Sequence, residues 1–255
     1  MKFDIFITAA PKDYNKLPYV LSSIHQNIKG FDEIIICSPT EIYLDVKQVR
    51  DKDILDIDLS KINYRSKWIY QQFLKLFQFI TKNEFYLTID ADTIINKPLD
   101  LFCGSGFFIK PIWYKGWDQN HQPYYNFNKQ ILGYERSVNH TFLADMNFFD
   151  RTLIYEMLWL FKDDNVYNSI SEIRKHLVNN FIEKSVSVIT NSCYPSEADL
   201  YGNFVFKEYP DLYQIRQLKT DCKGKFGEWT KEEIEERINI MKNTDFDTFS
   251  LHSWT

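Results

Sequence analysis

The sequence contains little that would divide the chain or anchor it in a membrane. Its 255 residues include no internal repeat, no low-complexity tract and no linker rich in Pro, Gly or Ser. No apolar run reaches the roughly 20 residues that a helix needs to cross a bilayer. The N-terminus also lacks a basic head followed by a long apolar segment. We therefore expect a single domain, 1–255, in a cytoplasmic protein with no membrane span.

Cysteine and net charge are also too low for several classes of protein. The four cysteines, Cys37, Cys103, Cys193 and Cys222, are far apart and form no C-x-x-C pair. This spacing suggests neither a zinc site nor a disulfide framework, so we expect reduced thiols. With 30 basic and 35 acidic side chains, the net charge of -5 disfavours extensive wrapping of nucleic acid. A nucleic-acid acceptor is disfavoured, although a local basic groove could still bind one.

The first ninety residues alternate predicted strands and helices. Apolar runs at 3–10, 33–38 and 54–59 predict buried strands, and a further strand is expected to end at Asp90. Apolar residues at helical spacing predict helices on 17–28 and 65–80. This βαβ order predicts an α/β fold, with a Rossmann-type, mostly parallel sheet and helices on both faces.

The pattern changes after Pro98. Segment 111–127 has no period and is crowded with Trp and Tyr, so we expect a long loop. The remaining elements are predicted from apolar runs and helical spacing: strands at 142–150 and 185–190, and helices on 151–162, 170–181 and 231–242. In the last of these helices, Thr230 and Glu233 have the spacing of a capping box.

Two aspartates stand where the strand after the second helix is expected to end. In FYLTIDADTIINKP (85–98), an apolar run precedes Asp90-Ala91-Asp92. Alternate side chains of an extended chain share a face, so Asp90 and Asp92 could converge on one divalent cation. Open α/β folds bind nucleotides at the carboxyl ends of their strands. The pattern predicts a metal and nucleotide site, although D-x-D pairs also occur as solvated turn acids.

These features resemble those of the GT-A nucleotide-sugar glycosyltransferases. The resemblance rests on the βαβ start, on Asp90-Ala91-Asp92, on an acidic segment late in the chain and on His252 near its C-terminus. WIYQQFLKLF, YLTIDADT and SEADLYGNF are also similar to segments of a little-characterised group of such enzymes. The resemblance implies a GT-A-like fold in which 1–98 binds the nucleotide sugar and 99–255 binds the acceptor.

The resemblance also implies a cation. Asp90, Asp92 and His252 would hold Mn²⁺ or Mg²⁺, which bridges the donor diphosphate. Asp92 would contact the cation directly, and Asp90 would touch the ribose or the cation. An imidazole ligand suits Mn²⁺ better than Mg²⁺.

Two groups of residues are expected to reach the donor. One group follows the first strand, at the nucleotide crevice outside the strand ends, where the resemblance places the base and ribose. The other lies along one face of the second helix, at spacings of three, four and three, and could face the diphosphate or sugar. The alternative for this second group is a solvated polar face. The two groups are Thr8, Ala9, Ala10 and Asp13, and Arg65, Trp68, Gln72 and Lys75.

The acidic segment PSEADLYGNF (195–204) supplies the candidate base. Ser196 is expected to cap a helix, with Asp199 completing a capping box. Glu197 would then be free in the first turn, where the helix dipole favours its ionised form. In inverting GT-A enzymes an acid at the comparable place deprotonates the acceptor hydroxyl. We therefore predict that Glu197 is the base, with Asp199 as the second candidate.

The sequence thus predicts a metal-dependent glycosyltransferase that moves a sugar from a nucleotide diphosphate donor, a UDP-sugar, to a hydroxyl of a glycan or other acceptor, with inversion. Trp113, Trp117 and Tyr124 are candidates for stacking on the acceptor, on a lid that excludes water. One alternative is a sugar-phosphate nucleotidyltransferase, which usually has a glycine-rich basic loop where this chain has TAAPKDYN. Another is a non-catalytic nucleotide-binding domain.

Overall fold

The computed structural model describes residues 1–105, 109–116, 121–167 and 169–254. Its strands are β1 (Phe3–Thr8), β2 (Phe31–Ser38), β3 (Lys47–Arg50), β4 (Phe85–Ile89), β5 (Thr93–Ile95), β6 (Phe102–Cys103), β7 (Lys110–Lys115), β8 (Met146–Asp150), β9 (Gln214–Gln217), β10 (Thr220–Asp221), β11 (Gly224–Phe226), β12 (Thr248–Ser250) and β13 (His252–Trp254). Its α-helices are α1 (Leu17–Asn27), α2 (Asp51–Ile54), α3 (Ser66–Phe77), α4 (Gln122–Leu132), α5 (Arg151–Trp159), α6 (Ile170–Val188), α7 (Glu197–Glu208) and α8 (Lys231–Met241).

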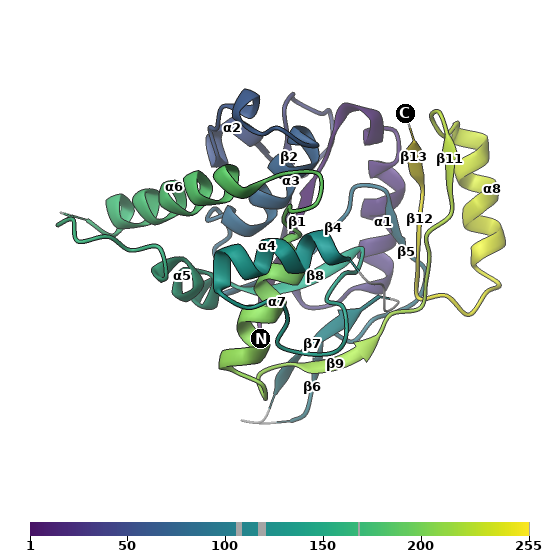
Figure 1. The fold of residues 1–255 in the computed structure, drawn as a ribbon. Helices are drawn as coiled ribbons and strands as arrows, with labels where there is room; N and C mark the ends of the chain where they lie inside the picture. The colour runs from purple at the N-terminus through teal and green to yellow at the C-terminus, as the bar shows by residue number, and fades with distance from the viewer. Residues whose placement is uncertain (106–108, 117–120, 168, 255) are drawn as a thin grey trace.

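The central sheet has the strand order β3-β2-β1-β4-β8 (Figure 1). The pairs β1–β2, β2–β3 and β1–β4 are parallel, and β8 is antiparallel to β4. Smaller sheets have the orders β10-β12-β5, β11-β13 and β6-β7-β9. The predicted α/β class is therefore confirmed, with a mixed sheet whose first four strands in this order are parallel.

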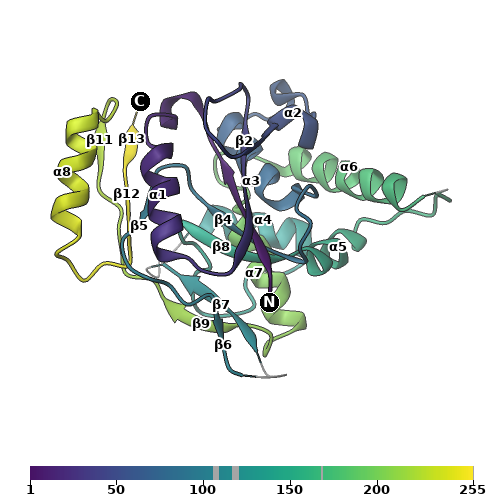
Figure 2. The same cartoon turned by 180° about the vertical axis from the view of Figure 1, so that it is seen from behind.

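Helices lie on both faces of this sheet, as expected. In Figure 1, α4 and α7 lie in front of the strands, and in Figure 2, seen from behind, α1 does. All six residues of β1 are buried, which suits a central strand covered on both sides. Buried side chains from both halves of the chain join one hydrophobic cluster.

The strand order reverses between β1 and β4. From β1 the chain proceeds to β2 and β3 on one side, and then returns to add β4 on the other. In the β1–β4 register, Phe6 lies opposite Thr88, so Thr8 and Asp90 stand at the same edge of the sheet. Such a reversal opens a crevice at the carboxyl ends of the two strands, where open α/β sheets bind ligands.

The predicted strand at 54–59 is wrong. The third strand of the sheet is Lys47–Arg50, and the chain then forms the short helix α2 and a 3-10 turn, Leu59–Lys61. Asp58 caps this turn by accepting a hydrogen bond from the Ser60 backbone N–H, at 3.1 Å. Strand β3 lies at the sheet edge and is held by its backbone pairing with β2, so it needs no apolar run.

The predicted long loop at 111–127 and the predicted strand at 185–190 are also wrong. Residues 110–115 form β7, paired on both sides by β6 and β9. Helix α4 follows, with Pro123 in its first turn and Gly133, at φ 84°, ending it. Residues 185–188 continue α6 despite the β-branched Val186 and Val188, because the buried face of the helix outweighs local propensity.

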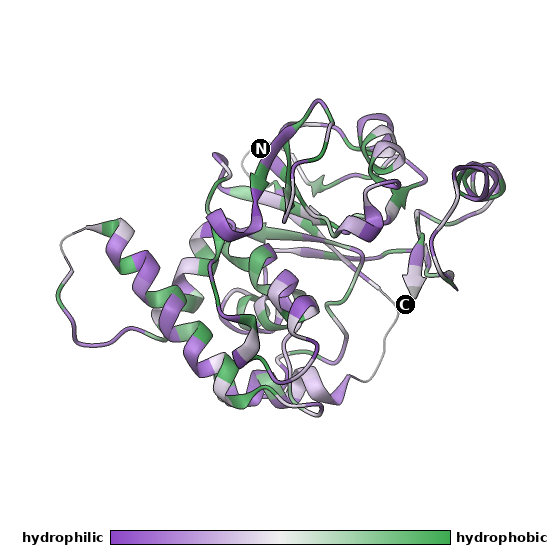
Figure 3. Cartoon of the chain, turned by 90° about the horizontal axis from the view of Figure 1, so that it is seen from above, coloured by the Kyte–Doolittle hydropathy of each residue, from purple (hydrophilic) through white to green (hydrophobic). Residues whose placement is uncertain are grey.

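Helix α6 projects from the sheet and alternates hydrophobic and polar bands along its length (Figure 3). Its buried residues recur at helical spacing, so only one face is covered. They are Leu177, Val178, Phe181, Ile182 and Ser185. Within the described ranges, no helix combines the length and the apolar character that a membrane span requires.

Candidate active site and metal centre

Backbone hydrogen bonds fix the turn that carries the two aspartates. The Thr93 N–H donates to the Asp90 carbonyl at 3.0 Å, which closes the turn between β4 and β5. The Asp90 N–H donates to the Asp145 carbonyl at 3.0 Å, and the Leu251 N–H donates to the Asp92 carbonyl at 2.8 Å. These bonds bring the residue before β8 and the link between β12 and β13 next to the aspartates.

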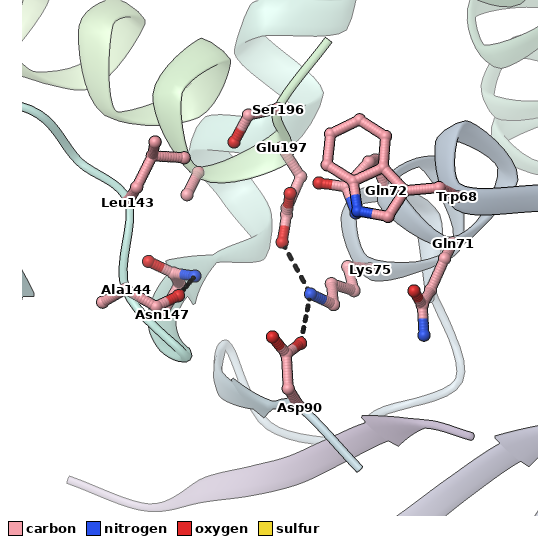
Figure 4. A pocket seen from close by; sticks show the side chains of 11 residues that line it. Trp68, Gln71, Gln72, Lys75, Asp90, Leu143, Ala144, Asn147, Ser196 and Glu197 are labelled. Carbon is pink, nitrogen blue, oxygen red and sulfur yellow. Dashed lines mark hydrogen bonds and ion pairs between the residues drawn. The ribbon is translucent and has the colours of Figure 1, made fainter. Parts of the chain in front are cut away.

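Lys75 joins Asp90 to Glu197 (Figure 4). Its Nζ lies 2.6 Å from Asp90 Oδ1 and 2.9 Å from Glu197 Oε1. Lys75 and Glu197 are buried, whereas 32% of the Asp90 side chain is exposed. Burial alone would lower the pKa of Lys75, but the charges of Asp90 and Glu197 outweigh it and hold that pKa above its ordinary value. Lys75 is therefore a fixed cation between two acids.

A small pocket opens beside this Lys75 bridge. It has a volume of about 130 Å³, below the roughly 300–1,000 Å³ of sites for drug-sized ligands. The pocket is therefore large enough for one small group but not for a whole nucleotide sugar. Its polar lining residues are Gln71, Gln72, Lys75, Asp90, Asn147, Ser196 and Glu197, and Trp68 lies at its wall (Figure 4).

The predicted face of α3 lines this pocket. Trp68, Gln72 and Lys75 all border it, and the last two are buried, so a solvated polar face does not describe these two residues, whereas Arg65 is exposed. Arg65 stands at the N-cap of α3 in the left-handed region, at φ 44°. Its guanidinium carbon lies 4.5 Å from the centre of the Trp68 ring. The cation of Arg65 is thus held near the pocket wall.

Asp92 belongs to a second cluster, with His252 and two residues that follow β1. Asp92 Oδ2 lies 3.0 Å from His252 Nδ1 and 3.9 Å from Nζ of the fully buried Lys16. Lys16 in turn contacts Asp13 Oδ1 at 2.7 Å. The structure therefore brings three predicted site residues together: Asp13 from the 3-10 turn after β1, Asp92 from the turn between β4 and β5, and His252 from β13.

The charges of this cluster shift two pKa values in opposite directions. Burial alone would raise the pKa of Asp92, but the hydrogen bond with His252 and the charge of Lys16 hold it below its ordinary value. The hydrogen bond to Asp92 raises the pKa of His252 to about 11. Asp92 and His252 therefore form an ion pair at neutral pH.

Sequence reasoning missed Asp145 and Cys222, which lie beside His252. Asp145 Oδ2 accepts hydrogen bonds from Ser250 Oγ at 2.7 Å and Thr220 Oγ1 at 2.9 Å. One ligand atom from each of Asp145, Cys222 and His252 lies within 4.8 Å of the others. Asp145 could have been suspected from its place directly before a strand, but nothing in the sequence near Cys222 marks it.

The residues present fit a divalent cation. Ligand atoms of Asp145, Cys222 and His252 lie within 4.8 Å of one another, close enough for one cation to bridge them. Asp92 lies beside this group, with its Oδ2 in a hydrogen bond to His252 Nδ1 at 3.0 Å. Asp90 Oδ1 is already engaged by Lys75, as Asp92 Oδ2 is by His252.

The predicted roles of Glu197 and Asp199 within helix α7 need correction. Ser196 does cap α7, accepting a hydrogen bond from the Asp199 N–H at 3.4 Å. The Asp199 carboxylate, however, accepts its hydrogen bond from Asn128 Nδ2 at 2.9 Å, because α4 packs against this turn. Glu197 is not free but buried against Lys75. Of the two acids, Glu197 lines the pocket.

The predicted aromatic platform is not formed by Trp113. This residue is fully buried in β7, where its ring stacks on Tyr201 with centroids 5.8 Å apart. Trp113 is therefore a core residue, because segment 110–115 is a covered strand. Tyr124 is buried in α4 and stacks on Trp68 at 6.2 Å, next to the pocket wall. Trp117 lies outside the described residues.

Asp199 gives a testable pH dependence. Burial raises the pKa of its carboxyl to about 6 from the ordinary 3.8, against the hydrogen bond from Asn128. Between these values the folded protein holds a proton that the unfolded chain has released, so the free energy of unfolding falls as pH rises. The contribution of this group is at most roughly 3 kcal/mol. We expect Asp199→Asn to flatten the pH dependence of urea unfolding in this range; curves parallel to the wild type would contradict the assignment.

Comparison with models of protein families finds no match to this chain, and neither does comparison with curated proteins.

Proposed function

We propose that this chain is a metal-dependent glycosyltransferase with a GT-A-like fold, which transfers a sugar from a nucleotide diphosphate, a UDP-sugar, to an acceptor hydroxyl. The observation that carries the proposal is the Asp92–His252 pair, 3.0 Å apart, at the reversal of strand order between β1 and β4. A divalent cation, Mn²⁺ or Mg²⁺, bound there would stabilise the charge that develops on the departing nucleotide diphosphate.

The residues around the crevice suit a nucleotide sugar. Residues 8–13 follow β1 at the reversal of strand order, where the base and ribose of a nucleotide would lie. Lys12 Nζ reaches the Ser253 carbonyl at 3.3 Å, which places a cation beside the terminal strand. Trp68 stands at the wall of the pocket and Arg65 lies over its ring, where they would contact the sugar and the diphosphate.

Glu197 is the acid placed to accept the proton of the acceptor. It lines the pocket that also contains Asp90, and its Oε1 lies 2.9 Å from Lys75 Nζ, which holds the carboxylate in place. A carboxylate is a side chain that can accept a proton from a hydroxyl. An acceptor hydroxyl entering the pocket would lie beside Glu197 on one side and the donor crevice on the other. This arrangement supports direct displacement with inversion.

One observation favours a second candidate, a nucleotide-binding domain without catalysis. Asp90 and Asp92 are each already paired with a cation of the protein, Lys75 and His252. A cation would have to displace the proton of His252 before binding there. If these pairs persist when a nucleotide binds, the site would bind UDP without metal.

A panel of UDP-, GDP- and dTDP-sugars tests the proposal through release of the nucleotide. We expect release with Mn²⁺ from a UDP-sugar, faster when an acceptor is supplied, and a loss of release in EDTA. Absence of release from every donor in the panel, in a chain that still binds UDP, would favour the non-catalytic domain.

A further inference from the structure

The trio of Asp145, Cys222 and His252 brings a sulfur to the proposed cation site. In the parallel pairs β10–β12 and β11–β13, Thr220 lies opposite Thr248 and Gly224 lies opposite His252. Cys222 lies between β10 and β11, so it stands beside the link between β12 and β13. Its Sγ is 4.0 Å from Asp145 Oδ2 and 3.8 Å from Thr220 Oγ1. The strand pairing thus fixes the thiol at the site.

Asp145 gives an independent reason to expect a cation. Its hydrogen bonds from Thr220 and Ser250 come from neutral hydroxyls. The neighbouring Asp90 carboxylate adds a second negative charge, and the opposing effect of the charge on His252 is smaller. A partly buried carboxylate with neutral donors is stabilised by a bound cation.

We propose that Asp145, Cys222 and His252 form a cation site beside Asp92, and that the sulfur makes this site select Mn²⁺, Co²⁺ or Zn²⁺ over Mg²⁺. The inference rests on the proposed function only for the presence of a cation. Thiolate and imidazole are ligands of borderline and soft cations, whereas Mg²⁺ prefers oxygen and retains its waters. On binding, the Cys222 thiol releases its proton to become the thiolate ligand.

Cobalt(II) alone, titrated into the purified full-length chain, provides a readout of the sulfur that does not depend on activity. A thiolate bound to Co²⁺ gives a charge-transfer absorption in the near ultraviolet, whereas oxygen and nitrogen ligands do not. We expect this band to saturate at about one Co²⁺ per chain, as for a single site. Cys222→Ser should lose the band, and Cys103→Ser, at a thiol hydrogen-bonded to the Lys110 carbonyl, should keep it.

Calorimetry of Mn²⁺ and Mg²⁺ binding tests the selectivity itself. We expect Cys222→Ser to weaken Mn²⁺ binding by about tenfold or more while changing Mg²⁺ binding much less. A Co²⁺ complex without the band in the wild type, or a band that survives Cys222→Ser, would overturn the inference, as would failure to bind any of these cations.

The outcomes separate this inference from the proposed function. A thiolate band in a chain that binds no nucleotide would support the ligand set and refute the transferase. Metal-dependent UDP binding without the band would support the transferase and refute the role of Cys222.

Discussion

Asp92→Asn is expected to abolish the Mn²⁺-dependent part of UDP binding. The substitution keeps the shape of the side chain but removes the negative charge that faces His252, 3.0 Å away. Loss of a charged ligand should weaken Mn²⁺ binding by about 100-fold. Calorimetric titration of UDP into the variant, with and without Mn²⁺, measures the effect.

The same substitution also removes the main cause of the raised pKa of His252. In the variant, the imidazole should therefore titrate closer to its ordinary 6.5, which NMR of the ring protons can follow. Asp32→Asn, at an exposed acid paired with Lys2, is the matched control and should bind UDP like the wild type. Unchanged metal-dependent binding in Asp92→Asn would remove Asp92 from the cation site.

Glu197→Gln is expected to lower the rate of transfer by about 10²–10⁴, the usual contribution of a general base. The amide has nearly the same size and can still accept the hydrogen bond from Lys75, so UDP binding should change little. Initial rates of nucleotide release, with saturating donor and acceptor, measure the effect.

Two other acids of α7 make this result specific. Glu208→Gln, exposed at the C-terminal end of the helix, should leave the rate unchanged. Asp199→Asn tests Asp199, the second candidate base, which is buried against Asn128. If Glu197→Gln retains most of the rate and Asp199→Asn loses it, the roles of the two acids are reversed.

The strongly periodic elements of the fold were predictable. Strand β1 and the apolar residues before Asp90 are buried runs, and α3 has a clear apolar stripe. These patterns involve only residues close together in the sequence, so they can be recognised without knowing how the rest of the chain folds. Strand β3 was missed because an edge strand is held by backbone pairing rather than by an apolar pattern. The C-terminal end of α6 was missed because tertiary packing overrides the β-branched residues there.

The candidate site was predictable only in part. The position of Asp90 and Asp92 after a buried strand was confirmed, because an apolar run ending in acids marks a strand end. The bridge of Lys75 between Asp90 and Glu197 was not foreseen, since it joins residues 122 positions apart through the packing of α3 against α7. Cys222 was likewise missed, because its neighbours Asp145 and His252 come from distant parts of the chain.

Titration of the wild-type chain with UDP, in Mn²⁺ and in EDTA, tests the central claim most directly. The claim is that the acids at the end of β4 bind a cation that in turn binds a diphosphate. We predict that Mn²⁺ tightens UDP binding by about tenfold to 100-fold, and that UDP tightens Mn²⁺ binding by the same factor. Equal affinity for UDP with and without Mn²⁺ would contradict the account.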